Sequence, residues 1–200
     1  MHPSPYGIPA AASFFAMNLA VERLTEAERP LLLAHLLALP APDRALRFGS
    51  ALRARLIAAY VAGVDFRRDA IFAVHDRRLM LAGAMHVAVQ GPEAELGVSV
   101  LPAYRRRGIA GALFRRAFEH ARNRSVRRVS LQWLSSNAAV ARIAARFGVE
   151  IVSMGVETRA CLKLAGPSPA SLAGEWLRDA LASVGGALNA FVAGWERRRD

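Results

Sequence analysis

One stretch near the middle of the chain, residues 94–121, constrains the fold more than any other part of the sequence. It begins with apolar and small residues in alternation, which predicts a β-strand that ends at Pro102, because proline cannot donate to a sheet ladder. A short loop of arginine and glycine follows, and apolar residues then recur at helical spacing from Ile109 onward. A helix that starts directly after such a loop exposes free N–H groups, and its dipole favours negative charge there. The stretch therefore predicts a phosphate-binding site.

The residues of this loop exclude two common phosphate-binding motifs. The sequence contains neither G-x-x-x-x-G-K-[ST] nor G-x-G-x-x-G, so it has no Walker A loop and no ordinary dinucleotide fingerprint. Instead, Arg105-x-x-Gly108-x-Ala110 follows a V-x-V-x-P strand and precedes an amphipathic helix. This combination resembles the [QR]-x-x-G-x-[GA] signature of the GNAT superfamily of acetyl-CoA-dependent N-acetyltransferases.

The resemblance implies an α/β domain in which helices flank a mixed, mostly antiparallel sheet. A second motif agrees with it, with matching residues at Asn137, Val140, Ile143 and Gly148. Ala144 stands at the position where members of the superfamily often have a tyrosine. The segment LPAPDRALRF at residues 39–48 is similar to a motif of a bacterial subgroup, and we expect residues 43–49 to be a connector between two helices, the second of them capped by Ser50.

The chain divides into three expected parts. We expect a loose leader at residues 1–17 and the acyl-CoA-binding domain at residues 18–165. Residues 168–200 should form an amphipathic helical tail capped by Ser171. Apolar residues alternate in the tail at spacings of four and three, at Leu177, Leu181, Val184, Leu188, Phe191 and Trp195. Such a stripe must be covered, and we expect the cover to be the chain's own domain or a second copy in a homodimer, rather than a membrane surface.

Charge and cysteine content limit the partners. The net charge is +11, all but one of the 27 basic residues are arginine, and nine arginines lie between Arg105 and Arg128. Such a cluster suits nucleic acid, an anionic membrane or a phosphorylated cofactor. Its place on the anion loop favours the cofactor, and the lack of interleaved aromatic residues argues against nucleic acid. No apolar run is long enough to span a membrane, and the single Cys161 suits a reducing cytoplasm.

By resemblance, acetyl-CoA is the cosubstrate, and its binding residues follow from the motif positions. The main chain of the central strand would pair with the pantetheine arm, the loop amides would hold the pyrophosphate, and an asparagine at a helix start would bond the pantetheine arm or cap its own helix. The expected binding residues are Val98, Val100, Arg105, Arg106, Arg107, Gly108, Ile109, Ala110, Gly111 and Asn137.

Acetyl transfer to an amine also needs a base, and Glu95 is the expected one. It lies on the central strand, where members of the superfamily often offer a carboxylate, while Glu93 in the preceding turn is a lesser candidate and a solvated surface role is the alternative for both. His75 and His86 lie on predicted strands, where a lone histidine is usually structural. Ala144 cannot protonate a leaving thiolate, and no histidine or cysteine spacing predicts a metal site.

These observations predict an N-acetyltransferase that moves an acetyl group from acetyl-CoA to a primary amine by direct attack in a ternary complex. The acceptor is a small molecule or a protein lysine or N-terminus, which the sequence does not identify. Two alternatives stay open at this point. One is a non-catalytic acyl-CoA-binding regulatory module, and the other is nucleic-acid binding through the arginine cluster.

Overall fold

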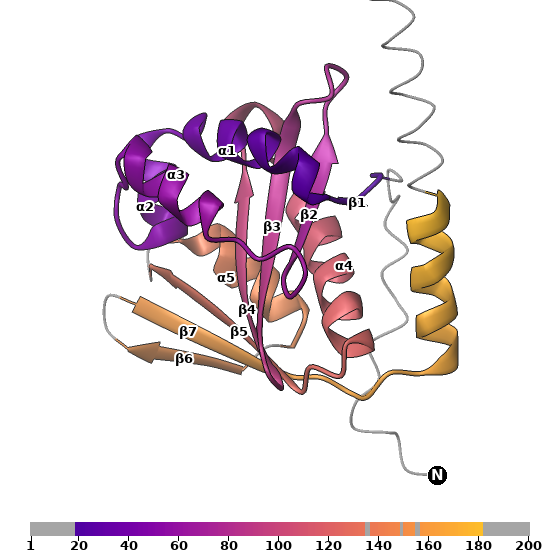
Figure 1. The fold of residues 1–200 in the computed structure, drawn as a ribbon. Coiled ribbons are helices and arrows are strands. Elements are labelled where there is room, and N and C mark those ends of the chain that lie inside the picture. The colour runs from indigo at the N-terminus through magenta and orange to yellow at the C-terminus, as the bar shows by residue number, and fades with distance from the viewer. Residues whose placement is uncertain (1–18, 135–136, 149, 155–156, 182–200) are drawn as a thin grey trace, which may run out of the picture.

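A seven-stranded sheet runs through the centre of the protein, in the order β1-β2-β3-β4-β5-β7-β6 (Figure 1). The computed structural model describes residues 19–134, 137–148, 150–154 and 157–181. Within these ranges β4 and β5 are parallel, and every other neighbouring pair of strands is antiparallel. This confirms the expected mixed, mostly antiparallel sheet. The strands are β1 (Glu22–Arg23), β2 (Ala70–His75), β3 (Leu81–Gln90), β4 (Glu93–Val100), β5 (Arg128–Leu134), β6 (Glu150–Met154) and β7 (Glu157–Lys163).

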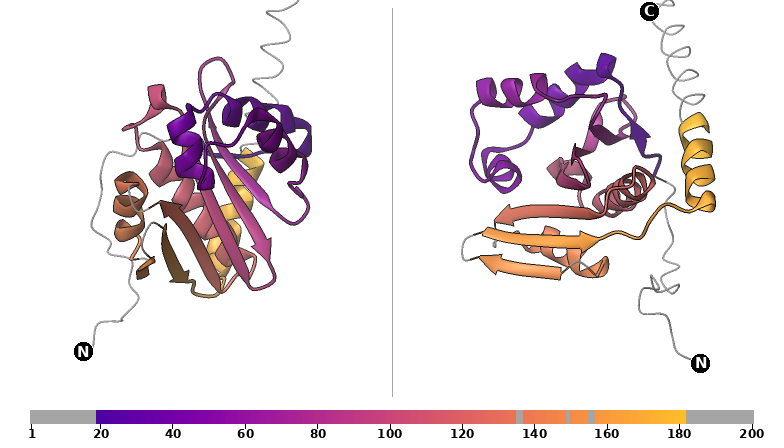
Figure 2. Two further views of the ribbon diagram at one scale, coloured as in Figure 1. Left: turned by 90° about the vertical axis from the view of Figure 1, so that its left-hand side faces the viewer. Right: turned by 60° about the horizontal axis from the view of Figure 1, so that its bottom comes forward.

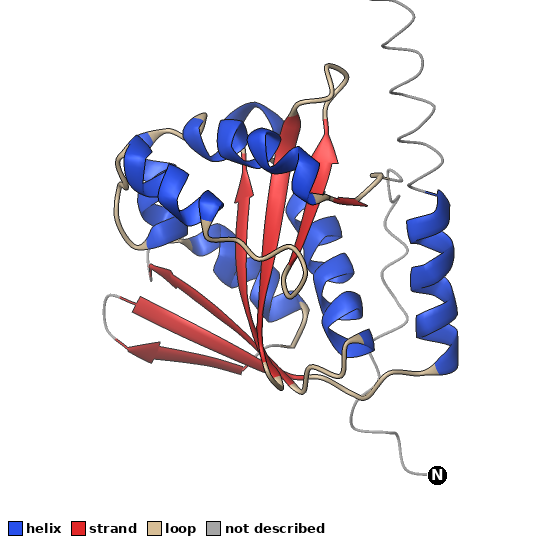
Figure 3. Cartoon of the chain, viewed as in Figure 1, coloured by secondary structure: helices blue, strands red, loops and turns tan. Residues whose placement is uncertain are grey.

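Helices cover both faces of the sheet (Figures 2 and 3). Two separate hydrophobic cores form, one on each face. Leu36 and Ile57 belong to the core of the first face, and Leu113 and Phe114 belong to the core of the second. The first face carries η1 (Glu26–Glu28), α1 (Arg29–Leu37), α2 (Ala41–Phe48) and α3 (Ala54–Ala62). The second carries α4 (Ile109–Asn123), which follows η2 (Pro102–Tyr104), and α5 (Ala138–Arg146).

The prediction of a connector at residues 43–49 is wrong, because residues 43–48 are helical and belong to α2. Pro40 is the N-cap of this helix, and Pro42 lies in its first turn. Proline is tolerated there because the first N–H groups of a helix have no partner to lose. The helix ends at Gly49, whose φ of +77° suits glycine.

The start of the next helix also differs from the prediction. Ser50 does not cap it, since α3 begins at Ala54 with Arg53 as its N-cap. Ile57 and Val61 are the buried residues of α3, whereas Leu56 is 46% exposed. The helix therefore starts three residues later than the sequence suggests, with its N-cap at Arg53 instead of Ser50.

The described part of the tail, residues 169–181, is a helix that lies beside α4 (Figure 1). Ser168 caps it rather than Ser171, because the Ser168 Oγ accepts the Ser171 N–H at 3.2 Å. Leu177 and Leu181 are 54% and 63% exposed, so the expectation that the described domain covers this stripe is wrong for these two residues. The rest of the stripe lies outside the described residues. Within the described part of the chain, no helix has the length and apolar character needed to cross a membrane.

Candidate active site

The loop ahead of α4 presents free N–H groups. Gly108 is the N-cap of α4, and its φ of +81° lies in the left-handed region that favours glycine. Glycine has no side chain that could cap the helix, and the Ala112 N–H makes the first backbone bond of the helix, to the Gly108 carbonyl at 3.0 Å. The N–H groups of Ile109, Ala110 and Gly111 precede that bond and are available to an anion. The structure thus has the geometry that the sequence predicts at this loop.

The three loop arginines have different surroundings. Arg105 Nη2 lies 2.6 Å from Asp43 Oδ2 on α2, and its Nε donates to the Val100 carbonyl at 3.2 Å. This side chain therefore anchors the loop to α2. Arg106 and Arg107 are exposed, and the Arg107 guanidinium stacks 5.6 Å from the centre of the Tyr104 ring. Their charge lies beside the free N–H groups of α4 and strengthens the positive potential there.

β4 and β5 separate halfway along β4. Their four paired positions end at Leu96, although β4 continues to Val100, and Figure 1 shows the two strands moving apart. The Leu101 N–H bonds toward β3, so alternation along the strand turns the N–H and C=O groups of Val98 and Val100 toward the opening. Main-chain groups on such an unpaired strand segment can bind an extended ligand as a further strand would.

The two candidate carboxylates of β4 differ in their partners. Glu95 is exposed, lies opposite Ala88 of β3, and has no ion pair within the described residues. It shares a sheet face with Gly97, two residues further along the strand and next to the opening. Glu93 instead lies 2.7 Å from Arg128 in an exposed ion pair. The structure therefore leaves Glu95 as the freer carboxylate near the opening.

Asn137 and Ala144 both lie on α5. Asn137 is its N-cap, and its side-chain oxygen accepts the Val140 N–H at 3.3 Å. The capping role is present, and the amide nitrogen is left for a further partner. Ala144 is 1% exposed and belongs to the core of the second face. An alanine methyl group at that position has no proton to donate, so α5 offers no acid there.

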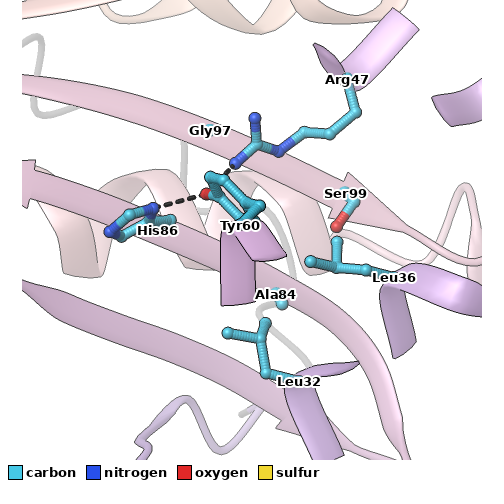
Figure 4. Close-up of a pocket in the computed structure, with 8 residues that line it drawn as sticks. All are labelled: Leu32, Leu36, Arg47, Tyr60, Ala84, His86, Gly97 and Ser99. Atoms are coloured by element: carbon cyan, nitrogen blue, oxygen red, sulfur yellow. Dashed lines mark hydrogen bonds between the residues drawn. The ribbon is translucent and has the colours of Figure 1, made fainter. Parts of the chain in front are cut away.

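A hydrogen-bonded network that the sequence did not predict crosses the first face of the sheet, and Figure 4 draws its residues Arg47, Tyr60 and His86. Its members are Asp69, His86, Tyr60 and Arg47, which we call the four-residue network. His86 Nε2 lies 3.2 Å from Asp69 Oδ2, and His86 Nδ1 lies 2.6 Å from the Tyr60 hydroxyl. Arg47 Nη2 donates to the same hydroxyl at 2.9 Å. The residues come from the turn before β2, from β3, from α3 and from α2.

The pKa values of both His86 and Asp69 are lower than their ordinary values. Burial lowers the pKa of His86, while the hydrogen bond to Asp69 raises it less, so the ring is neutral at pH 7. Burial alone would raise the pKa of Asp69, but hydrogen bonds from Arg68, from the Val89 N–H and from His86 lower it below its ordinary value. The network therefore holds a carboxylate beside a neutral imidazole.

The network reaches the opening between β4 and β5 through Gly97. His86 and Gly97 are direct cross-strand neighbours, and a Cβ atom on Gly97 would lie 2.0 Å from Arg47 Nη2. Only glycine lets the guanidinium approach the strand so closely. Stacking on Phe48 and Tyr60, at 4.8 and 5.7 Å from the ring centres, also holds Arg47 there. A glycine inside the central strand, between Leu96 and Val98, is the one sequence signal that could have indicated a close approach at this point.

Comparisons with known proteins agree with this geometry. Residues 45–149, more than half of the chain, match the acetyltransferase (GNAT) family. A comparison with curated protein sequences gives no match. The described residues contain no cluster of histidine, cysteine, aspartate or glutamate that could hold a metal ion.

Solved structures with the same fold include the GNAT domain of S. lividans PAT, at TM-score 0.62 and 19% identity over 72% of this chain and 89% of that one. Ribosomal-protein-alanine N-acetyltransferase from Brucella melitensis aligns at TM-score 0.56 and 18% identity, over 72% and 99%. Spermidine N-acetyltransferase from Vibrio cholerae, solved with CoA and spermine, aligns at 0.57 and 14%, over 72% and 94%. The family match and the shared fold together show that this chain belongs to the GNAT family of acyl-CoA-dependent N-acyltransferases.

Proposed function

We propose that this protein transfers an acetyl group from acetyl-CoA to a primary amine, by direct attack of the amine in a ternary complex. One observation carries the proposal: an uncapped helix N-terminus at Gly108 and the unpaired strand segment of Val98 and Val100 follow each other along the chain. The first suits a pyrophosphate and the second suits an extended, amide-containing arm. CoA carries both groups.

The residues present fit this cosubstrate, which supplies an activated thioester when bound. The N–H groups of residues 106–111 would hold the pyrophosphate, and the exposed side chains of Arg106 and Arg107 would add positive charge. The main chain of Val98 and Val100 would pair with the pantetheine arm. Arg105 would contribute indirectly, by fixing the loop to α2. The amide nitrogen of Asn137 would donate to the pantetheine arm.

The amine has two protons to lose. An alkylamine is protonated at pH 7, so one proton leaves before attack and a second leaves as the amide forms. We assign the first step to Glu95, because its carboxylate is exposed, unpaired in the described residues and next to the opening. No side-chain acid stands at Ala144, so the thiolate takes its proton from solvent.

We infer the chemical class of the acceptor from the acetyl-transfer reaction itself. Among proteins of similar fold, one is named for a ribosomal-protein alanine and another for spermidine, and both acceptors are primary amines. We propose a primary amine of a small molecule or a protein lysine or N-terminus. Cytoplasmic location is part of the proposal, because the lone thiol of Cys161 suits a reducing compartment.

Contact with a second copy of the chain is also part of the proposal. Trp176, Leu177 and Leu181 are 74%, 54% and 63% exposed on the described part of the tail helix. Apolar side chains that gather on one exposed helix are typical of an interface. The molar mass in solution should therefore be that of a dimer, and Leu177→Glu should reduce it to that of a monomer.

CoA binding tests the loop directly. Gly108→Asp should abolish CoA binding, because it adds a side chain and a negative charge where the pyrophosphate would lie. Gly91→Asp is the matched control, since Gly91 also has a positive φ, of +57°, but lies in the turn between β3 and β4. Calorimetric titration with CoA should show binding to the control and none to Gly108→Asp. Equal affinities for CoA in the two folded variants would refute the cofactor site.

Thiol release tests catalysis. The wild-type protein with acetyl-CoA should release CoA thiol in the presence of at least one of three amines: spermidine, a peptide with a free N-terminal alanine, and an N-blocked peptide with one lysine. CoA binding without thiol release would favour the non-catalytic module instead. Glu95→Gln should lower the turnover rate at pH 7 with unchanged CoA affinity, whereas Glu93→Gln, two residues away, should leave it unchanged.

A further inference from the structure

The four-residue network has a defined hydrogen-bond direction. Asp69 is a carboxylate and can only accept, so the proton of the neutral His86 ring lies on Nε2. His86 Nδ1 then accepts from the Tyr60 hydroxyl, 2.6 Å away. The Tyr60 oxygen accepts from Arg47 at 2.9 Å and retains a second lone pair. The hydroxyl oxygen is thus arranged to accept one more N–H and to pass its own proton inward.

The hydroxyl oxygen lies beside the opening where β4 leaves β5. Tyr60 and Gly97 line a small cavity of ≈ 10 Å³, about the size of one water molecule, together with Leu32, Leu36, Arg47, Ala84, His86 and Ser99 (Figure 4). The Arg47 guanidinium that binds the hydroxyl also lies over Gly97, the first β4 residue beyond the paired positions. Glu95 is on the same face, two residues earlier.

We propose that Tyr60 takes the second proton of the acceptor amine and passes its own hydroxyl proton to His86. As the nitrogen–carbon bond forms and the carbon–sulfur bond breaks, the N–H proton moves to the Tyr60 oxygen, and the Tyr60 proton moves to His86 Nδ1. An imidazolium then stands against the Asp69 carboxylate, and the electron pair of the broken bond leaves with the thiolate. Tyr60 is the catalytic residue of this step, and His86, Asp69 and Arg47 are positioning residues.

The charges around His86 suit a transient proton. Asp69 faces Nε2, while Arg47 on α2 and Arg68 before β2 oppose a lasting positive charge on the ring. Burial lowers the pKa of His86 below its ordinary value, so the ring is free to accept at neutral pH. The proton therefore does not stay on the ring, and the network is ready for the next turnover.

The proposal rests on the acetyltransfer function proposed above, and pH separates its two proton acceptors. The test uses the fastest amine of the three-amine panel. Tyr60→Phe keeps the ring but removes the hydroxyl, and it should lower kcat about 100-fold, with unchanged CoA affinity and little change in the KM for the amine. The defect should persist at alkaline pH. The Glu95→Gln defect should instead shrink as pH approaches the amine's own pKa, because solvent then removes the first proton.

A second variant and a matched control separate loss of catalysis from loss of the folded structure. His86→Gln should lower kcat by at least about tenfold. His35→Gln is the matched control, because His35 likewise bonds through both ring nitrogens, to the Leu81 carbonyl at 2.8 Å and the Ser99 hydroxyl at 2.9 Å. Its kcat per folded molecule should equal that of the wild type.

A readout that needs no acceptor completes the test. ¹⁵N NMR of the histidine rings should show His86 as the Nε2–H tautomer with an unprotonated Nδ1. The Nδ1–H tautomer would overturn the proposal, and so would a wild-type kcat for Tyr60→Phe. A protein with the expected tautomer that acetylates no amine would refute the proposed function, and the proton transfer with it.

Discussion

Two polar networks, one on each face of the sheet, place a histidine against a carboxylate, and they differ in what surrounds that pair. On the second face, Arg116, His120, Asn123, Glu175 and Asp179 form what we call the tail network, which joins α4 to the helix at residues 169–181. Glu175 accepts from Arg116 at 2.8 Å, from His120 at 2.7 Å and from Asn123 at 2.6 Å. The four-residue network instead contains a hydroxyl, that of Tyr60, beside an opening.

The difference teaches how the same pair of residue types can serve structure or proton transfer. In the tail network, fixed donors occupy both carboxylate oxygens of Glu175, and Arg116 is further held 4.7 Å over the Phe72 ring. These contacts leave no free acceptor for a transferred proton, and they hold α4 and the tail helix together. In the four-residue network, Arg47 donates to Tyr60, Tyr60 to His86 and His86 to Asp69, and the Tyr60 oxygen keeps a lone pair. A network whose acceptors are all occupied stabilises the fold, whereas a network with a free acceptor can take part in proton transfer.

The largest effect is expected from removing the carboxylate of the tail network. Glu175→Ala leaves the buried Arg116, 5% exposed, without one of its two acidic partners. Breaking a buried charge pair in this way costs about 3 kcal/mol, which lowers the melting temperature by roughly 6–12 °C in a domain of this size. Calorimetry measures this effect. Turnover per folded molecule should not change, because the network is remote from the opening.

The control for this variant lies between the same two helices. Glu119 pairs with Arg178 at the exposed edge of the contact, and Glu119→Ala should cost no more than about 1 kcal/mol. An equal loss of stability in the two variants would show that burial does not distinguish the tail network from a surface ion pair.

A smaller effect is expected when the four-residue network is disturbed without changing its members. Gly97→Ala places a Cβ atom 2.0 Å from Arg47 Nη2, and the guanidinium can move aside because it is the end of a flexible side chain. Tyr60 then loses its donor. Turnover should fall about tenfold, which corresponds to about 1.4 kcal/mol, with little change in melting temperature. Unchanged turnover, measured by thiol release, would remove Arg47 from the mechanism.

The sequence could predict the loop and α4 because their signals are local. The free N–H groups, the left-handed Gly108 and the buried face of α4 all lie within one stretch of chain. The helical spacing expected from Ile109 onward is confirmed, since α4 buries Ile109, Leu113 and Ala117. In contrast, α2 was missed because prolines that usually end a helix here begin one.

The four-residue network could not be predicted because its members come from separate elements. The strand register places His86 opposite Gly97, and α3 then brings Tyr60 over both. A lone histidine in a strand pattern carries none of this information, and its structural interpretation was incomplete. The face by which the tail helix contacts α4 could not be predicted for a related reason. Its apolar stripe favoured burial, but the buried Arg116 and His120 of α4 needed acidic partners, which the other face of the helix supplies.

The pH dependence of stability should separate the two networks. Burial lowers the pKa of His86, so below about pH 6.5 the unfolded chain takes up a proton before the folded chain does. Burial alone would raise the pKa of Glu175, but hydrogen bonds from His120, Asn123 and Arg116 hold it well below 4.5. Stability linked to His86 is therefore lost as pH falls from about 6.5, and stability linked to Glu175 only below about 4.5.

Urea unfolding between about pH 3 and 8 measures both ranges. His86→Gln should flatten the decline in the upper range and Glu175→Gln that in the lower range, by up to about 1.4 kcal/mol per pH unit for one fully linked proton. His35, whose pKa burial also lowers, contributes to the upper range in both variants. A His86→Gln protein that differs from the wild type only below about pH 4.5 would contradict the assignment.

The smallest effect is expected at a third contact, where an ion pair belongs to neither network. Arg105 is 45% exposed and lies 2.6 Å from Asp43, which neutralises its charge beside the loop. The pair is partly exposed, since the Asp43 side chain is 13% exposed, and such a pair contributes about 1 kcal/mol, so Asp43→Asn should change the melting temperature only slightly. The variant frees the Arg105 guanidinium and raises the positive potential at the loop. CoA affinity should therefore rise about two- to threefold at low salt, and the gain should disappear at high salt, because screening removes it. A loss of CoA affinity on titration would instead mean that the anchor to α2, rather than the charge of Arg105, is what the loop needs from this residue.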